Sequence, residues 1–123
     1  MTKPFKSRDY DPLISLIVPV YNEQDVIEIF LDKTSAIMER AGLDFEYVFV
    51  NDGSTDATLE KLIKLSASNP RIRVINLSRN FGKEAGMTAG IDHVRGNVLI
   101  PIDVDLQDPP ELIPEFVEKW REG

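Results

Sequence analysis

The sequence predicts an α/β domain built on a doubly wound, mainly parallel sheet with helices on both faces. Short, nearly continuous apolar runs alternate four times with segments whose apolar residues recur at helical spacing. Strands buried on both faces have this apolar character, and crossover helices join parallel neighbours. Polar residues follow each apolar run, at the sheet end where ligands of such folds bind. Together these patterns indicate a Rossmann-like domain with a ligand site.

The first half of the chain contains two strand–helix units. Residues 13–20 form an apolar run that predicts a buried strand. A helix is predicted next, with an apolar stripe from Ile27 to Ala41 and with Gly42 placed for a C-terminal cap. Residues 45–50 predict the second strand. The second helix is expected to bury Leu59, Leu62, Ile63 and Ser66, and its capping candidates are Ser54, Thr55 and Asp56.

The second half repeats this alternation. Residues 72–77 predict a strand near the sheet edge, and residues 87–94 predict a helix rich in glycine and alanine. Residues 98–102 predict a fourth strand. Pro101 is unfavourable at a central position of a sheet, because proline donates no ladder hydrogen bond.

A last helix is predicted by an apolar stripe near the C-terminus. Asp108 and Glu111 match a capping box, with Pro109 at the first helical position. No fifth strand follows, so residues 13–123 are expected to be part of a larger domain. Residues 1–12 are polar and predict a loose N-terminal arm. The stripe of the last helix consists of Ile113, Phe116, Val117 and Trp120.

Composition and charge exclude several classes of function. The 123 residues carry a net charge of −7, which argues against nonspecific nucleic-acid binding. The chain has no cysteine and one histidine, His93, so thiolate and clustered-histidine metal sites are excluded. No apolar run is long enough to span a bilayer, and the N-terminus lacks an apolar signal segment. We therefore expect a soluble, cytoplasmic chain.

The densest group of polar residues follows the fourth strand. In the usual 3-2-1-4 strand order, the ligand crevice lies between strands one and four. Asp103, Asp105 and Gln107 stand at positions i, i+2 and i+4, so on an extended segment their oxygens would point the same way. Such hard oxygen ligands suit Mg²⁺ or Mn²⁺. Asp108 alone accounts for capping the next helix, which leaves Asp103 and Asp105 for a metal or ligand.

Two further candidates lie at the same sheet end. Asp52 follows the second strand, where it is either a turn residue before Gly53 or a carboxylate that accepts a hydrogen bond from a nucleobase or ribose. Lys83 is the most plausible cation for a ligand anion, and a helix starting there would offer free amides. His93 is expected to have no catalytic role.

Four motifs together resemble glycosyltransferase family 2, whose fold is called GT-A. They are SLIVPVYNEQ, VFVNDGSTDAT, SRNFGKEAGMTAG and PIDVDLQDPPELI, and the match runs from about Leu13 to the C-terminus. The NFGKEAG and DLQDPPE stretches are most similar to the polyprenyl-phosphate glycosyltransferases. In that subgroup the chain continues with an acceptor region and membrane helices, so the resemblance implies that this stretch alone transfers no sugar.

The resemblance also implies site residues. Pro19, Val20, Tyr21 and Glu23 would line the nucleotide pocket, and Asp52 would contact the base. Gly82 and Lys83 would close over the nucleotide. Asp103 and Asp105 would be the catalytic carboxylates, with Asp103 beside the ribose and diphosphate. Asp105 and Gln107 would hold Mg²⁺ or Mn²⁺ on the diphosphate.

The implied reaction is inverting transfer of a sugar from a nucleoside diphosphate. A UDP-sugar is the favoured donor, a GDP-sugar is the second choice, and a polyprenyl phosphate is the expected acceptor. The full-length protein would act at the cytoplasmic face of the inner membrane. Two alternatives stay open: a module that binds nucleotide-sugar without catalysis, and a family 2 transferase that acts on a saccharide acceptor.

Overall fold

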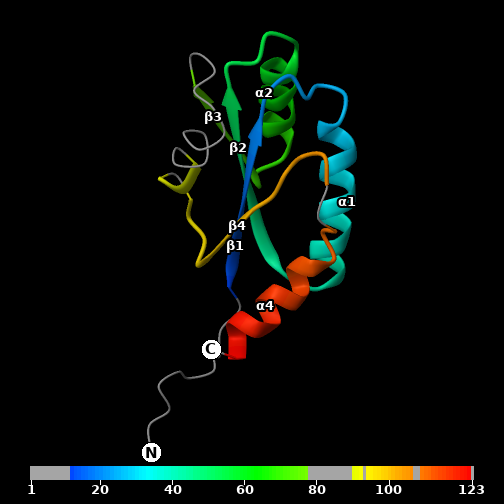
Figure 1. Cartoon of the computed structure of the whole chain (residues 1–123), viewed down its shortest axis with the longest axis vertical. Helices are drawn as coiled ribbons and strands as arrows, with labels where there is room; N and C mark the ends of the chain where they lie inside the picture. The colour runs from blue at the N-terminus through cyan, green and yellow to red at the C-terminus, as the bar shows by residue number, and fades with distance from the viewer. Residues whose placement is uncertain (1–11, 78–89, 93, 107–108, 123) are drawn as a thin grey trace, which may run out of the picture.

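A computed structural model describes residues 12–77, 90–92, 94–106 and 109–122 of the chain. The four strands are β1 (Leu13–Val20), β2 (Asp44–Asp52), β3 (Ile72–Leu77) and β4 (Val98–Pro101). They form one parallel sheet in the order β3-β2-β1-β4, as predicted. Figure 1 shows β1 and β2 running side by side with their carboxyl ends at the top of the view.

Three helices contribute side chains to one core beside the sheet. They are α1 (Ile27–Arg40), α2 (Thr58–Ser68) and α4 (Leu112–Glu122). Alternate residues of β1 and β2 join this core, as expected for strands whose side chains point to opposite faces. Buried aromatic rings occupy its centre, where Phe30 of α1 packs edge-on against Tyr47 and Phe49 of β2. Helix α1 ends where predicted, with Gly42 at a φ of 69°.

The other face of the sheet is also covered. A Cβ atom added at Gly90 would lie 2.5 Å from a methyl group of Ile17 and 3.2 Å from one of Val50. Residues 90–91 are helical, and most of the predicted helix at 87–94 lies outside the described residues. The close contact at Gly90 agrees with the expectation that this glycine-rich segment packs tightly against the sheet. The prediction of an α/β fold with a mainly parallel sheet is confirmed.

Pro101 is accommodated because β4 has a strand on one side only within the described sheet. Its backbone lies opposite Ile17 of β1. The next residue, Ile102, donates its amide to the Ile17 carbonyl oxygen at 3.0 Å and so continues the ladder past the proline. None of the helices in the described parts of the chain is long and apolar enough to cross a membrane.

Two helices differ from the sequence prediction. In α2 the buried positions are Thr58 and Leu62, whereas Ile63 is 54% exposed, so the predicted face is rotated by about one residue. Helix α4 begins at Leu112 rather than at Pro109. The reason is local, because a residue before a proline avoids the helical region and Pro109 precedes Pro110.

The start of β4 is clamped to the start of β1. Glu46 is buried and accepts hydrogen bonds from the Ser15 hydroxyl at 2.6 Å and from the Arg95 amide at 2.7 Å. The Gly96 amide in turn donates to Ser15 Oγ at 2.8 Å. A Cβ atom at Gly96 would lie 2.7 Å from the Leu13 carbonyl oxygen and closer still to Ser15 Oγ. A side chain at this position therefore requires the backbone to move.

We expect the Gly96→Ala substitution to lower the free energy of unfolding by about 1–3 kcal/mol, the usual cost of overpacking. Urea denaturation followed by circular dichroism measures the change. Gly42→Asn is the matched control, because Gly42 has open space around its Cα and asparagine tolerates its positive φ. Equal losses in the two variants would show that the clamp is not tightly packed.

Candidate functional site

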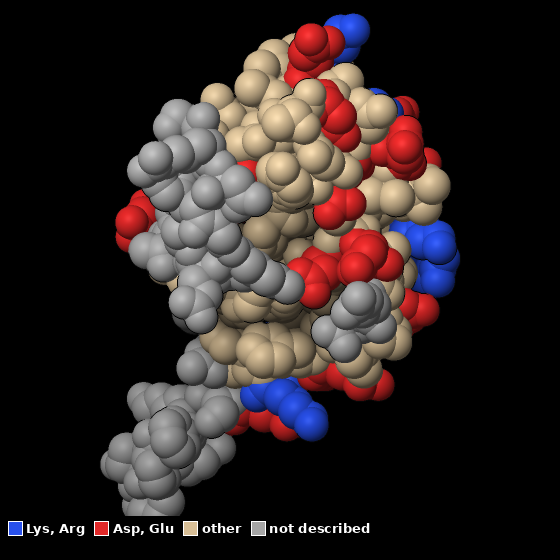
Figure 2. All heavy atoms as spheres, turned by 45° about the horizontal axis from the view of Figure 1, so that its top comes forward, with Lys and Arg blue, Asp and Glu red and all other residues tan. Residues whose placement is uncertain are grey.

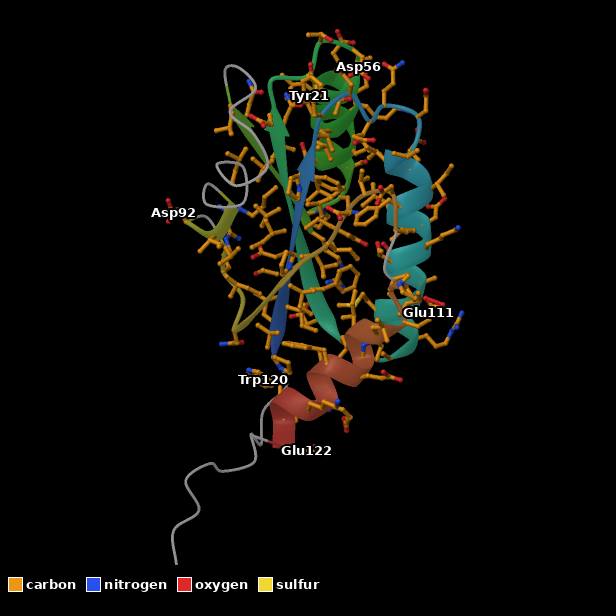
Figure 3. The ribbon with its side chains drawn as sticks, in the orientation of Figure 1. Tyr21, Asp56, Asp92, Glu111, Trp120 and Glu122 are labelled. Carbon is orange, nitrogen blue, oxygen red and sulfur yellow. The ribbon has the colours of Figure 1, made fainter. Side chains whose placement is uncertain are left out.

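The loops that follow β1, β2 and β4 lie at one end of the sheet, where α/β folds bind ligands. Tyr21 begins the loop after β1, and Asp56 lies in the loop after β2. Figure 3 places these two residues together at the top of the molecule, far from Trp120 at the other end. Tyr21 is 42% exposed, so its ring is available to a ligand.

Side chains of the first loop occupy the amides that lead into α2. Asn22 Oδ1 accepts from the Thr55 amide at 2.7 Å and from the Asp56 amide at 3.2 Å. Gln24 Oε1 accepts from the Ala57 amide at 2.8 Å. The Thr58 amide donates to Asp56 Oδ1 at 2.9 Å, although the N-cap position itself is Ala57 and not one of the predicted capping residues. Four consecutive amides are thus satisfied by side-chain oxygens.

The side chains that occupy these four backbone amides limit anion binding there. A helix N-terminus is a common phosphate site because its amides are free to donate. The amides of residues 55–58, in the turn that leads into α2, already have acceptors, so a diphosphate would have to displace side chains to use these four. A metal ion or a lysine would supply positive charge to a ligand anion without displacing these side chains.

Carboxylates from three loops come close enough to influence one another. The pKa of Glu23 is raised above its usual 4.5, chiefly because the carboxyl is partly buried. The negative charges of Asp105, Asp56 and Asp103 raise this pKa further, in that order of size. Figure 2 looks toward this end of the molecule and shows acidic side chains outnumbering basic ones on the visible surface. The loops after β1, β2 and β4 thus build one negatively charged site.

The segment after β4 turns at residues 103–106, so the extended form predicted for Asp103 and Asp105 is wrong. The Leu106 amide donates to the Asp103 carbonyl oxygen at 3.1 Å, and Leu106 has a φ of 56°. The turn places Asp103 in a half-buried position and Asp105 in an exposed one. The apolar side chains of Val104 and Leu106 pack on the core, which favours the turn over an extended segment.

Backbone strain is concentrated at this site. Asn22 and Leu106 are the non-glycine residues with positive φ in the part of the chain that the structure describes. Each is next to an acidic candidate, since Asn22 precedes Glu23 and Leu106 follows Asp105. Unfavourable backbone conformations of this kind cluster at functional sites, where surrounding contacts hold them. The strain supports the assignment of this sheet end as the functional site.

The acidic residues fit a magnesium or manganese ion that shares its ligands with a substrate. Among the described residues, no group of three or more His, Asp and Glu side chains could hold a metal ion by itself. Mg²⁺ is usually held by one or two carboxylates, by waters and by phosphate oxygens of the substrate. The exposed carboxylate of Asp105 suits such a shared site. Gln107, the other predicted ligand, lies outside the described residues.

The remaining predicted residues have different surroundings. Asp52 ends β2 and is only 5% exposed, so its carboxylate lies under the loops. Pro19 is half-buried in β1, and Val20 is buried in the core, where it supports the start of the Tyr21 loop. Gly82, Lys83 and His93 lie outside the described residues.

Sequence reasoning missed three polar residues that organise the site. Asn22 and Gln24 hold the amides before α2, and Thr58 Oγ1 accepts from the Glu23 amide at 2.9 Å. A turn role for Asn22 could have been predicted from its residue type, because asparagine tolerates a positive φ and its side-chain oxygen readily accepts from backbone amides in turns. The pairing of the two loops could not be read from sequence, since its partners are more than 30 positions apart.

The raised pKa of Glu23 predicts a pH-dependent stability. A carboxyl whose pKa is higher in the folded than in the unfolded state binds its proton more tightly when folded. Its contribution to stability is therefore present below pH 4.5 and is lost as the pH rises through the folded-state value. We expect Glu23→Gln to raise the melting temperature at pH 7 without metal, by an amount that shrinks toward pH 4.

Thermal denaturation at several pH values measures this difference. Asp25→Asn is the matched control, because it removes one negative charge from an exposed position of the same loop. A Glu23→Gln variant that is less stable than the parent protein at pH 7 would contradict the expectation.

The sequence model for Glycosyl transferase family 2 matches residues 15–123 of this chain. A prophage bactoprenol glucosyl transferase homolog of Escherichia coli K12 is 48% identical over 110 residues, which cover 89% of this chain and 36% of that protein. A bactoprenol glucosyl transferase of Shigella phage SfV is 47% identical over the same coverage. The chain thus spans about a third of the length of these curated relatives.

Solved structures agree with the fold. A mannosyltransferase of Pyrobaculum calidifontis, solved with GDP-Man and Mn²⁺, has a TM-score of 0.69 at 23% identity and covers 89% of this chain and 36% of its own. TarS of S. aureus, residues 1–349, solved with UDP-GlcNAc, has a TM-score of 0.63 at 29% identity. That match covers 75% of this chain and 26% of the TarS chain. The GT-A fold implied by the sequence motifs is confirmed.

Proposed function

The chain belongs to glycosyltransferase family 2, and from this premise we propose that it forms the donor side of an inverting glycosyltransferase. The donor would be a sugar nucleotide, with a UDP-sugar favoured over a GDP-sugar. Residues 13–123 would be the nucleotide-sugar-binding part of a larger domain. The observation that carries the proposal is the group of carboxylates from three loops at the carboxyl end of the sheet, with Asp105 and Asp103 close enough to Glu23 to raise its pKa.

The nucleoside would bind between the first two loops. Tyr21 offers an exposed ring, and Asp52 offers a buried carboxylate that can accept a hydrogen bond from a base N–H. Uracil and guanine both carry such a donor, a ring N–H next to a carbonyl group. In cytosine the corresponding ring nitrogen has no hydrogen and is an acceptor, so it cannot donate to a carboxylate. Pro19 and Glu23 would complete the pocket, with Gly82 and Lys83 closing over the nucleotide.

The diphosphate would lie beside Asp103 and Asp105. The amides of residues 55–58 that lead into α2 are occupied, and Mg²⁺ or Mn²⁺ on Asp105 and Gln107 would supply positive charge instead. When bound, this ion would stabilise the negative charge that develops on the departing diphosphate. Asp103, which is half-buried, would orient the ribose and fix the diphosphate for displacement.

The acceptor is proposed to be a polyprenyl phosphate. Support comes from relatives that are named bactoprenol glucosyl transferases and are 47–48% identical to this chain. A phosphate monoester has a second pKa of about 6, so it is largely ionised at neutral pH and attacks without a strong general base. The acceptor site would come from the rest of the protein, at the cytoplasmic face of the membrane.

Isothermal titration of the chain with UDP, GDP and their sugars, with and without Mn²⁺, tests the proposal. We expect UDP-sugars to bind at least tenfold more tightly with Mn²⁺ than without it. Tighter binding of GDP-sugars would overturn the uridine preference alone. The absence of metal-dependent binding for every nucleotide would overturn the donor-site proposal.

A further inference from the structure

We propose that Asn22 is a positioning residue of the donor site, which locks the loop after β1 onto the turn before α2. The inference rests on the proposed donor function, since Asn22 stands between two residues of the proposed nucleotide pocket. One of these is Tyr21, with its exposed ring. The other is Glu23, whose pKa is raised by burial and by the charges of Asp105 and Asp103. Holding Asn22 in place therefore sets the direction in which both neighbours point.

The side chain of Asn22 makes the lock. Its amide oxygen accepts from the Thr55 amide at 2.7 Å, from the Asp56 amide at 3.2 Å and from the Thr55 hydroxyl at 3.3 Å. Its backbone adopts a φ of 52°, a left-handed conformation that asparagine tolerates better than most side chains. Three donors converging on one oxygen hold this backbone conformation in place.

The lock extends to the third strand. The backbone N–H of Asn22 donates to Ser54 Oγ at 3.0 Å, and the Ser54 hydroxyl donates to Asn51 Oδ1. Asn51 Nδ2 then donates to Asn76 Oδ1 at 2.9 Å, near the end of β3. The loop after β1 is thus tied through one directional chain to the ends of β2 and β3.

The location of Asn22 indicates a positioning role and not a contribution to the stability of the core. The side chain is exposed and contributes nothing to the apolar core, which lies below the strand ends. Removing it should therefore change the geometry of the two loops more than the stability of the fold. A positioning role predicts a loss of ligand affinity without a matching loss of global stability.

The test compares Asn22→Gly with the parent protein. Glycine keeps the positive φ and the backbone N–H that donates to Ser54 Oγ, so only the three hydrogen bonds to the side-chain oxygen are lost. We expect hydrogen exchange of the Thr55 and Asp56 amides to accelerate at least tenfold without ligand. We also expect UDP to bind about tenfold more weakly in the presence of Mn²⁺, with the urea midpoint nearly unchanged. Asn22→Asp, which keeps the oxygen acceptor, should retain slow exchange at both amides.

Asn69→Gly is the matched control. Asn69 Oδ1 also accepts from a backbone amide, that of Arg71 at 3.0 Å, but it precedes β3 at the opposite end of the sheet. This variant should lose protection at Arg71 and keep its affinity for UDP.

Two readouts distinguish failure of the lock from failure of the donor proposal. Unchanged exchange at Thr55 and Asp56 in Asn22→Gly would overturn the lock, whatever the nucleotide does. Accelerated exchange with unchanged UDP affinity would overturn the positioning role. If the parent protein does not bind UDP, the donor function fails and the positioning role fails with it, while the exchange data still report on the lock.

Discussion

Replacing Asp105 by alanine is expected to weaken Mn²⁺-dependent binding of a UDP-sugar roughly 100-fold, which corresponds to about 2.7 kcal/mol. Asp105 is an exposed carboxylate whose charge acts on Glu23, in a site where the backbone amides of the turn before α2 already have acceptors. Without this carboxylate the proposed site would lose a ligand for the cation, and a bound diphosphate would lose its counter-charge. In a full-length enzyme, the rate of transfer should fall by a similar or larger factor.

The control for this substitution is Asp92→Ala. Asp92 is an exposed carboxylate on the segment at one side of the molecule, away from the Tyr21 end (Figure 3). Calorimetric titrations of both variants with a UDP-sugar and Mn²⁺ give the comparison. Metal-independent binding that is unchanged in Asp105→Ala would contradict the assignment of Asp105 as a metal ligand.

The largest effect on stability is expected from Phe30→Ala. Phe30 is fully buried, and its ring centre lies 5.9 Å from that of Tyr47 and 6.0 Å from that of Phe49. Truncating a buried phenylalanine costs about 3–5 kcal/mol, because it removes apolar contacts and leaves a cavity. A domain of this size is stable by only about 5–15 kcal/mol, so a large part of its stability would be lost.

Urea denaturation measures the effect, which should appear as a lower midpoint with a similar slope. Phe116→Ala on α4 is the matched control, because that ring is 51% exposed and its loss should cost less than about 1 kcal/mol. Equal destabilisation by the two substitutions would contradict the packing of α1 on β2.

Most of the fold could be predicted from the sequence because each strand is a short apolar run between helical stripes. The predicted strand at residues 13–20 has the same bounds in the structure, and the sheet has the predicted order. The buried stripe of α1 was also predicted, from Ile27 to Met38. The rotation of α2 was not, because Leu59, Leu62 and Ile63 are all apolar and only packing decides which of them faces the sheet.

The site was predictable in its location but not in its geometry. Parallel strands bring their carboxyl ends together, so the proximity of Glu23, Asp103 and Asp105 follows from the strand order. The turn at Leu106 did not follow, because it depends on burying Val104 and Leu106 against the core. The lock made by Asn22 depends on two loops that meet only in the folded chain. Both features need tertiary contacts that no local pattern reveals.

A nuclear magnetic resonance titration of the chain with UDP and substoichiometric Mn²⁺ tests most directly whether the donor site lies at the carboxyl end of the sheet. This location predicts that the amide signals of Glu23 and Asp105 broaden first and most strongly, while those of Arg95 and Asn97 at the opposite end of the sheet stay sharp. Broadening centred on Arg95 and Asn97 would contradict it. So would broadening centred on the groove that Lys33 and Arg40 line together with Leu106, Pro109 and Glu111.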